Sequence, residues 1–446
     1  MKIALHNLGC KVNAYETDAI REMLEGVGHV IVPFKGMADI YIVNTCTVTN
    51  IADRKSRQML HRAKKYNPDG LVIAMGCYVQ AQEKQAQEKQ THKEQTQKQH
   101  YEQQDDNIDI IIGNNKKQEL LSVIKSYDEQ QEKNIAVVVD IAKEKGYEDL
   151  SLSTIKEHTR AYIKVQDGCN QFCSYCIIPH VRGRVRSRAK SEVIQEITAL
   201  VNAGCKEVIL TGIHLSSYGT DFETKETLLS LIKEVAKIKG LQRIRLGSLE
   251  PRIVDEEFVK ALKDIEQFCP HFHLSLQSGC DETLKRMNRR YDSAEYREKC
   301  KLLRKYFENP AITTDVIVGF PAETQEEFES THQFLQEVKL YETHIFKYSK
   351  REGTPAATMK EQVREEVKQE RSQILLALAE KNKQVFEQQF TGRVVEVLVE
   401  EKVLRDGEEW WVGHTKEYIK VALKSKEDIK NQILRVEMNN HLQIVH

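Results

Sequence analysis

Apolar and polar positions follow a strand-then-helix order through the first third of the chain. Short apolar runs have the length of buried strands, and the stretches between them space apolar residues as one face of a helix does. The apolar runs lie at residues 3–5, 40–43, 71–74 and 108–112, and the helical patterns at 15–25 and 53–65. Because strands separated by helices pair in parallel, residues 1–146 are predicted to form an α/β domain around a parallel sheet.

The same order continues over residues 155–388. Strand candidates alternate there with helical patterns, which predicts a complete or partial β/α barrel. The strand candidates are residues 161–165, 207–211, 243–247, 272–276, 314–318 and 343–347. The helical patterns are residues 191–202, 227–239, 255–264, 294–306 and 326–339.

The pattern changes to a period of two near residue 389. A long helical pattern over residues 361–389 ends there, and short strand candidates follow it at close spacing. This arrangement predicts a small β-barrel over residues 389–446. Its strand candidates are residues 394–399, 410–412, 418–423, 433–436 and 442–445.

A low-complexity segment, residues 80–106, interrupts the first domain. The pentapeptide Ala-Gln-Glu-Lys-Gln occurs twice in it, and almost no apolar residue follows. Such a segment has no apolar face to bury. We interpret it as a solvated insertion that is partly helical or disordered.

The composition restricts where a partner can bind. The 446 residues include 66 Lys and Arg against 67 Asp and Glu, so a nucleic-acid surface has to be local. Ten cysteines without an export signal indicate reduced thiols or metal ligands rather than disulfides. No apolar run is long enough to span a bilayer, and we therefore predict a cytoplasmic protein without a membrane partner.

Three cysteines in a C-x3-C-x2-C run, Cys169, Cys173 and Cys176, directly follow the strand candidate at 161–165. Three thiolates on one short loop can bind three irons of a [4Fe–4S] cluster and leave the fourth iron open to another ligand. A zinc site completed by His180 is the main alternative, because zinc takes four Cys or His ligands. A disulfide fits less well, since the number of cysteines is odd.

A second set of cysteines, Cys10, Cys46 and Cys77, lies just past three predicted strands of the first domain. Ligands of open α/β sheets bind outside the carboxyl ends of the strands, so these thiols can converge on one point and form a second three-thiolate site. Alternatively, each is a small apolar residue buried for packing. Cys205, Cys269, Cys280 and Cys300 share no such context, and no histidine spacing indicates a ligand pair.

Polar residues and glycines at the ends of the barrel strands are candidate cofactor-binding residues. Glycine lets a backbone approach a ligand closely, and Ser, Gln and Glu can bond hydroxyl or amino groups. The alternative is ordinary turn chemistry. The candidates are Thr211, Gly212, Ser248, Glu250, Gln277, Asp315 and Gly319, together with Arg289, whose planar guanidinium can pair with a carboxylate.

Two basic segments are candidate RNA contacts. Arg182, Arg184, Arg186 and Arg188 follow the cysteine loop without an intervening acid, which suits phosphate contacts. Lys416, Tyr418 and Lys420 have even spacing, so in one strand they share a face that carries two cations and an aromatic ring. The alternative in both places is a solvated charged surface.

These motifs together resemble the radical S-adenosylmethionine methylthiotransferases. Gly168-Cys-Asn-Gln-Phe-Cys-Ser-Tyr-Cys-Ile-Ile-Pro-His-Val-Arg-Gly-Arg184 is similar to that family's cluster loop, and Cys10, Cys46 and Cys77 match its N-terminal domain in order and context. The resemblance covers nearly the whole chain apart from the Gln-rich insertion. It implies a flavodoxin-like N-terminal domain, a radical S-adenosylmethionine barrel and a C-terminal β-barrel that resembles the RNA-binding TRAM module.

The resemblance also implies cofactors and a reaction. Cys169, Cys173 and Cys176 would bind a [4Fe–4S] cluster whose open iron takes S-adenosylmethionine and reduces it to a deoxyadenosyl radical. Cys10, Cys46 and Cys77 would bind a second, auxiliary [4Fe–4S] cluster that carries sulfur, which another S-adenosylmethionine methylates. The radical would remove hydrogen from carbon 2 of an adenine, and the methylthio group would be delivered there.

Within that family, Gly9-Cys-Lys-Val-Asn13 and Asn44-Thr-Cys-Thr-Val-Thr-Asn50 most resemble the branch that acts on N6-threonylcarbamoyladenosine in the anticodon loop of tRNA. Sister branches modify isopentenyladenosine or a ribosomal-protein aspartate. The implied partners are an electron donor of the flavodoxin or ferredoxin type and a sulfur source. A zinc-bearing RNA-binding protein is the alternative from another class.

Overall fold

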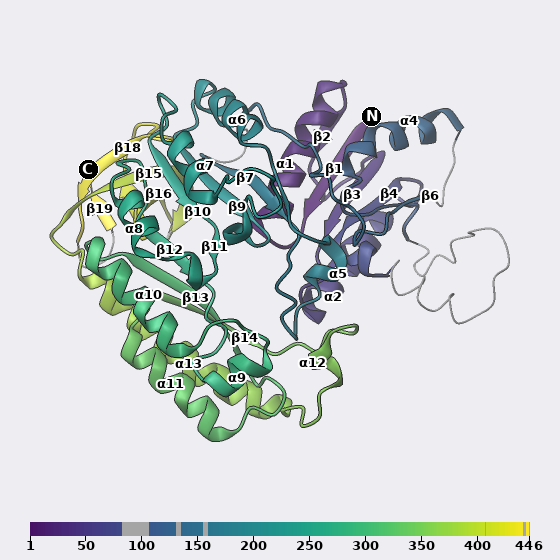
Figure 1. Ribbon diagram of the computed structural model, residues 1–446. Coiled ribbons are helices and arrows are strands. Elements are labelled where there is room, and N and C mark those ends of the chain that lie inside the picture. Colours follow the sequence, from purple (N-terminus) through teal and green to yellow (C-terminus); the bar gives the residue numbers. More distant parts are fainter. Residues whose placement is uncertain (83–106, 131–134, 155–158, 406, 440–442, 446) are drawn as a thin grey trace.

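The structure is a computed structural model that describes residues 1–82, 107–130, 135–154, 159–405, 407–439 and 443–445. Three groups of strands follow one another along the chain (Figure 1). The N-terminal and C-terminal sheets lie on opposite sides of the central barrel strands. Most of the predicted insertion at 80–106 lies outside the described residues.

The N-terminal sheet is parallel throughout and has the strand order β2-β1-β3-β4-β5-β6. Its strands are β1 (Lys2–Asn7), β2 (Val30–Val32), β3 (Ile40–Thr45), β4 (Leu71–Gly76), β5 (Ile110–Ile112) and β6 (Ile135–Val137). Its helices are α1 (Lys11–Gly26), α2 (Asn50–Tyr66) and α4 (Leu120–Gln130). Successive side chains of β3 enter different apolar cores, with Ile42 in one and Val43 in the other, so both faces of the sheet are buried.

The two strands missing from the sequence prediction are β2 and β6. Each has three residues, and neither is fully buried. Both stand at the edges of the sheet, where one side of the backbone has no neighbour. Their apolar runs are therefore too short to be recognised by pattern.

The central strands form the predicted partial barrel. One sheet has the order β10-β9-β7-β8 and the next the order β11-β12-β13-β14, and a bridge between Ile244 and Phe268 connects their neighbouring edges. The strands are β7 (Arg160–Asp167), β8 (Arg186–Ser187), β9 (Glu207–Gly212), β10 (Arg243–Leu246), β11 (Ser248–Leu249), β12 (His271–Leu274), β13 (Ala311–Val318) and β14 (Glu342–Lys347). All pairings are parallel except that of β8 with β7.

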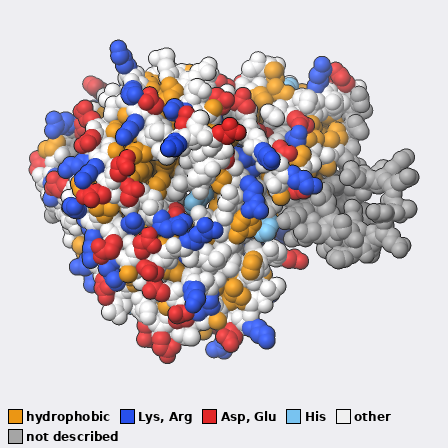
Figure 2. Space-filling view, viewed as in Figure 1, with side chains coloured by type: hydrophobic (Ala, Val, Ile, Leu, Met, Phe, Trp, Pro, Cys, Tyr) orange, Lys and Arg blue, Asp and Glu red, His pale blue; other side chains and the backbone are white. Residues whose placement is uncertain are grey.

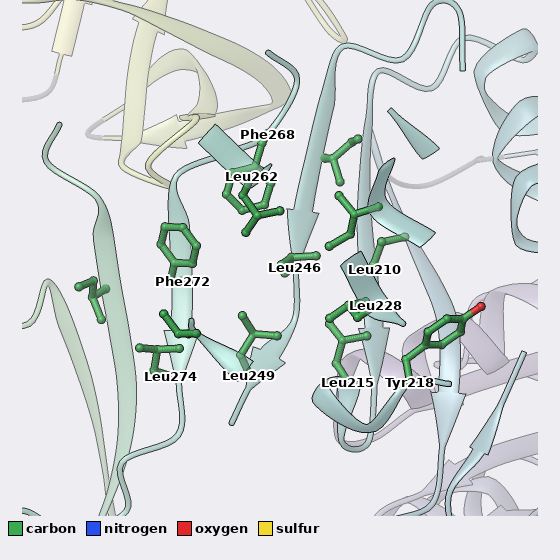
Figure 3. Close-up of a cluster of buried hydrophobic side chains, with 14 of the residues drawn as sticks. Leu210, Leu215, Tyr218, Leu228, Leu246, Leu249, Leu262, Phe268, Phe272 and Leu274 are labelled. Atoms are coloured by element: carbon green, nitrogen blue, oxygen red, sulfur yellow. The ribbon is translucent and has the colours of Figure 1, made fainter. Parts of the chain in front are cut away.

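Helices cover the outer face of these strands (Figure 1). They include α6 (Lys190–Asn202), α7 (Leu228–Val235), α8 (Glu256–Lys263), α10 (Ser293–Tyr306), α11 (Gln325–Val338) and α13 (Glu365–Gln388). The shorter helices α5 (Ile178–Arg182), α9 (Asp281–Arg286) and α12 (Pro355–Thr358) lie in the connections between elements. Figure 3 shows part of the largest apolar core, with Leu246, Phe272 and Leu274 from the strands beside Leu262 from α8. Apolar side chains thus fill the space behind the strands and leave the inner face to polar residues.

The C-terminal sheet has the order β18-β15-β16-β17-β19 and is mostly antiparallel, which confirms the period-two pattern. Its strands are β15 (Val394–Arg405), β16 (Glu408–Thr415), β17 (Lys420–Lys424), β18 (Ile433–Glu437) and β19 (Gln443–Val445). Arg243 and Arg245 of β10 donate to carbonyls of this sheet, including His414 O at 2.9 Å and Lys416 O at 2.9 Å. The sheet therefore sits near the amino ends of the barrel strands, and the carboxyl ends stay available for a site.

The described surface mixes basic, acidic and apolar side chains, as Figure 2 shows for one face. This distribution agrees with the near-zero net charge. None of the helices among the described residues is both long enough and apolar enough to cross a membrane.

Candidate functional site

The strand-end triplet, Cys10, Cys46 and Cys77, is brought together at the carboxyl ends of β1, β3 and β4. Cys46 and Cys77 are buried, whereas Cys10 is exposed. A β-carbon on Gly9 would lie 2.9 Å from Cys46 Sγ, and Gly9 has a φ of +106°, so only glycine allows the two loops to approach this closely. The three cysteines therefore follow neighbouring strands at one edge of the sheet.

Asn13 connects the backbones of two of the three cysteine loops, those of Cys10 and Cys46. Its side-chain nitrogen donates to Leu8 O at 2.8 Å and to Thr45 O at 3.0 Å, so it ties the loop before Cys10 to the residue before Cys46. Its side-chain oxygen accepts from Cys10 Sγ at 3.8 Å. A buried amide that uses both of its ends in this way fixes where the thiols point.

The loop triplet, Cys169, Cys173 and Cys176, connects β7 to α5. Cys169 and Cys173 are buried and Cys176 is half-buried. Cys169 N donates to Gly183 O at 3.0 Å, and Arg289 donates to Cys173 Sγ at 3.1 Å. A β-carbon on Gly168 would lie 1.8 Å from Arg184 O, so the loop depends on this glycine, whose φ is +70°.

Desolvation raises the pKa of several of these thiols. The pKa of Cys46 rises to about 12, that of Cys176 to about 12 and that of Cys169 to about 11, each chiefly through burial. Thiolate is the form that binds metal, so loading either triplet with metal displaces protons. The positive groups near the sulfurs, Arg182 and Arg289, oppose burial by favouring the thiolate.

The described positions of the sulfurs do not match the ligand spacing around a single zinc ion. Four ligands about 2.3 Å from one zinc lie within roughly 4 Å of one another. Among the described residues, which include all ten cysteines, neither triplet brings three ligand atoms within 4.8 Å of one another. His180 instead has an edge-to-face ring contact with Phe172 at 6.0 Å. The zinc alternative at Cys169, Cys173, Cys176 and His180 is therefore wrong for this geometry.

Arg182 joins the two triplets. It is fully buried at the end of α5, which leads directly out of the loop triplet. Its Nε donates to Cys77 Sγ at 3.3 Å, and one terminal nitrogen donates to Asn13 Oδ1 at 2.7 Å. The other terminal nitrogen donates to Glu16 at 2.9 Å and to Asp167 at 3.0 Å. One side chain thus contacts a cysteine of the strand-end triplet and the strand that precedes the loop triplet.

A buried group of charges surrounds Arg182. Glu16 pairs with Lys117 at 3.3 Å, with Lys164 at 2.9 Å and with Arg182 at 2.9 Å, all four side chains being at most 1 % exposed. Burial alone would raise the pKa of Glu16, but Arg182, Lys117 and Lys164 lower it well below its usual value. The carboxylate is therefore ionised, and it fixes α1 against β7.

The predicted RNA contact of three arginines is wrong. Arg182, Arg186 and Arg188 are at most 2 % exposed, because buried carboxylates and carbonyls hold them inside the protein. Arg188 pairs with Glu196, and Arg186 donates to Arg182 O at 2.9 Å. Only Arg184 of the four is exposed, and it lies 4.6 Å over the ring of Phe172.

The predicted shared face of Lys416, Tyr418 and Lys420 is also wrong. Residues 416–419 form the turn between β16 and β17, so the three residues do not occupy one strand. Tyr418 has a φ of +72°, and its ring stacks between His271 and His414 with centroids 4.9 and 4.5 Å away. Lys416 donates to Glu266 O at 2.9 Å, which leaves Lys420 exposed on the strand.

Some of the predicted cofactor residues lie near the loop triplet. Arg289 contacts Cys173, and Gln277 N donates to Asp315 O at 2.8 Å. Gly212 packs against Gln166, where a β-carbon would lie 2.7 Å from Gln166 Oε1. Gln166 in turn donates to Gly168 O at 2.7 Å, next to Cys169. These residues stay candidates for binding a cofactor beside the loop.

Other predicted cofactor residues have roles in turns and packing, as the alternative of ordinary turn chemistry predicts. Gly319 N donates to Glu323 at 2.6 Å, and a β-carbon on Gly319 would lie 2.3 Å from Lys368 of α13. Glu250 accepts from Arg252 at 2.8 Å. Thr211 is buried and Ser248 is exposed.

Arg351 makes a second link between the barrel and the strand-end triplet. It follows β14 and donates to Asp53 at 2.7 Å and to Asn50 at 2.8 Å, both on α2, and to Thr47 Oγ1 at 2.7 Å. Thr47 directly follows Cys46. No pattern in the sequence indicates this contact, because the two segments are about three hundred residues apart.

Comparison with known proteins agrees with the two-part site. Residues 163–335 match the radical SAM superfamily, and residues 2–96 match the family described as Uncharacterized protein family UPF0004. The chain is 39 % identical to threonylcarbamoyladenosine tRNA methylthiotransferase MtaB of Bacillus subtilis, over 98 % of this chain and 93 % of the relative. It is 33 % identical to the tRNA-2-methylthio-N(6)-dimethylallyladenosine synthase of Acetivibrio thermocellus, over 98 % of this chain and 88 % of the relative.

A solved structure shares the fold. The radical S-adenosylmethionine methyltransferase TsrM from Kitasatospora setae, with cobalamin and a [4Fe-4S] cluster bound, superposes with a TM-score of 0.56 at 14 % identity. The match covers 80 % of this chain and 74 % of that structure. It confirms an α/β fold of the radical S-adenosylmethionine kind.

Proposed function

The chain belongs to the tRNA methylthiotransferases that carry a radical S-adenosylmethionine domain, and we propose that it converts N6-threonylcarbamoyladenosine at position 37 of tRNA to its 2-methylthio derivative. It is a transferase that uses S-adenosylmethionine and a [4Fe–4S] cluster. The proposal rests on the contacts of Arg182. This residue follows the loop triplet and donates to Cys77 of the strand-end triplet and to Glu16.

Two bound clusters would supply radical generation from S-adenosylmethionine at the loop triplet and a sulfur atom at the strand-end triplet. The chain's own residues prepare both places. Cys169, Cys173 and Cys176 leave one iron position for S-adenosylmethionine, and Arg289 faces Cys173. Cys10 is the exposed member of the strand-end triplet, so that side of the second site faces the substrate.

We further propose the following division of the chain and its partners. Residues 1–146 hold the sulfur-carrying site, residues 155–388 the radical chemistry, and residues 389–446 an RNA-contacting module. Arg184 and Lys420, the two exposed members of the predicted RNA contacts, are available to tRNA phosphates. A flavodoxin or ferredoxin supplies electrons, a separate source supplies sulfur, and the enzyme acts in the cytoplasm with its tRNA substrate.

A sister function on isopentenyladenosine is the second candidate, since the relative from Acetivibrio thermocellus carries that kind of name. Its identity of 33 % is lower than the 39 % of the relative from Bacillus subtilis at the same coverage of this chain. The two candidates differ in the substituent on the adenine N6: an apolar isopentenyl group, or a group with a carboxylate and a hydroxyl.

Deletion of the gene is expected to remove 2-methylthio-N6-threonylcarbamoyladenosine from total tRNA almost completely. Mass spectrometry of the nucleosides should still show N6-threonylcarbamoyladenosine, because the deletion blocks only the last step. Wild-type protein should restore the product, and Cys46→Ala should not. Loss of the methylthio form of isopentenyladenosine instead would assign the sister function.

A further inference from the structure

Three polar side chains meet on the inner face of the barrel without belonging to either triplet. His273 of β12, Asp315 of β13 and His344 of β14 bring their ligand-type atoms within 4.8 Å of one another. His273 Nε2 lies 3.4 Å from Asp315 Oδ2, and the two histidine rings stack with centroids 5.9 Å apart. We call these residues the inner polar group.

Strand register puts the inner polar group on one face. Asp315 pairs directly with His344, and His273 pairs with Thr313, two residues before Asp315. The alternate residues Phe272, Leu274, Ile312 and Val316 are in the apolar core behind the strands. The inner polar group therefore faces away from that core, toward the inside of the partial barrel.

A chain of contacts connects this wall to the loop triplet. Arg289 contacts Cys173 Sγ and donates from Nε to Tyr291 OH at 3.0 Å. Tyr291 OH donates to the carbonyls of Ser275 and Leu276, just past the end of β12. His273 of the inner polar group thus lies on β12, whose end is linked through Tyr291 to Arg289, the residue that contacts Cys173.

Lys11 places the strand-end triplet near the same wall. It follows Cys10 at the start of α1, and Asp315 is among the groups whose charge acts on it. Its side chain is exposed. Its ammonium group makes no hydrogen bond or ion pair with any residue that the structure describes.

The reaction determines where the substrate base lies. The adenine carbon 2 has to reach both the radical side and the sulfur side, so the base lies between the two triplets. Carbon 2 and carbon 6 of adenine both flank ring nitrogen 1, so the N6 substituent is held within a few ångströms of the reacting carbon. A residue that binds this substituent must therefore lie close to the base that reaches both triplets.

Resting on the proposed function, we infer that Lys11 and the inner polar group bind the N6 substituent of the substrate and select one that carries a carboxylate. Lys11 pairs with the carboxylate, the histidines donate to it or to the hydroxyl, and Asp315 accepts from the hydroxyl or the urea N–H. An isopentenyl group would leave these polar side chains without partners, which a polar binding site penalises strongly. Lys11 and the inner polar group thus form a specificity site.

The test compares two substrates that differ only in the carboxylate. Anticodon stem–loop RNA carrying N6-threonylcarbamoyladenosine is compared with the same RNA carrying its methyl ester, using full-length, iron-loaded enzyme without oxygen. Wild-type enzyme is expected to bind the free acid about 10- to 100-fold more tightly, as a charged hydrogen-bonded pair requires. In Lys11→Gln the preference should fall to within about 2-fold, and in His344→Ala binding of the acid should weaken about 10-fold.

Matched controls keep the result interpretable. Lys55→Gln on the exposed surface of α2 and His332→Ala on α11 should keep the wild-type preference. Iron content is measured for each variant, and Lys11→Arg, which keeps the charge, should keep most of the preference if Lys11→Gln fails to load iron.

Three results would overturn the inference. The first is equal binding of acid and ester by wild-type enzyme that still methylthiolates the acid; the proposed function would then survive. The second is an unchanged preference in both Lys11→Gln and His344→Ala. The third is one equivalent of zinc or another metal ion that is lost in His344→Ala, which would assign the inner polar group to a metal. Wild-type enzyme that modifies only RNA with isopentenyladenosine would instead refute the proposed function.

Discussion

Cys173→Ala is expected to stop the cleavage of S-adenosylmethionine, whereas Cys46→Ala is expected to keep cleavage and lose sulfur insertion. The reason is that the two triplets are separate ligand sets on separate loops, and each loses one of three ligands in its variant. Removal of a ligand should cost more than the roughly 100-fold that an outer-shell contact costs at a metal site. Deoxyadenosine and methylthiolated nucleoside are measured in the same reaction by mass spectrometry.

Cys280→Ala is the control for this pair of variants. Cys280 is buried at the start of α9 and belongs to neither triplet, so both products should form as in the wild type. Equal loss of deoxyadenosine and of methylthiolated nucleoside in Cys46→Ala, with iron still bound at the loop triplet, would show that the two sites do not divide the work.

Arg182→Met is expected to destabilise the protein by about 3 kcal/mol, the lower part of the range for removing one partner of a buried ion pair. Glu16 and Asp167 lose their shared guanidinium, but Lys117 and Lys164 still face Glu16, which limits the loss. Denaturant unfolding of the iron-free chain measures this cost. Arg182 also donates to Cys77, so a cluster bound there should lose a hydrogen bond and shift to a more negative reduction potential.

Arg184→Met is the matched control two residues away. Its guanidinium is exposed over Phe172, so its removal should cost at most about 1 kcal/mol. If Arg182→Met and Arg184→Met unfolded at the same denaturant concentration, Arg182 would not be the link between the two halves of the site.

Most of the fold could be predicted, because each long strand is a short continuous apolar run of the kind that is typical of a buried strand. The strands β3 and β4 are buried at every residue, and their runs were recognised in the sequence. The strands β2 and β6 could not be recognised in the sequence. Each has three residues, is partly exposed and lies at a sheet edge, so it is too short to show a pattern of apolar and polar positions. The convergence of Cys10, Cys46 and Cys77 followed from a general rule about the carboxyl ends of parallel strands.

The arginines after the loop triplet are predicted to contact RNA, but three of the four are buried in the protein. A run of four arginines has the same composition whether it faces RNA or a set of buried acids. The acids that bury Arg182 and Arg188, Glu16 and Glu196, belong to α1 and α6. Only the folded chain brings α1 beside α5, so no local pattern could identify Glu16 as a partner.

The inner polar group could not be found from spacing either. His273, Asp315 and His344 are about forty and thirty residues apart, and they meet only through the register of three strands. Lys11, on which the charge of Asp315 acts, lies far from them in the sequence, at the start of α1. Residues that bind a substrate side group come together in the same way, because several segments of a chain line a binding pocket.

The central proposal is that the chain holds two iron–sulfur clusters, one on each cysteine triplet. Iron and sulfide analysis of the anaerobically reconstituted full-length protein tests it most directly, with the Cys46→Ala and Cys173→Ala variants measured beside the wild type. About eight irons and eight sulfides per wild-type chain, and about four of each in either variant, are the expected result. About four irons in the wild type, or zinc without sulfide, would contradict the claim.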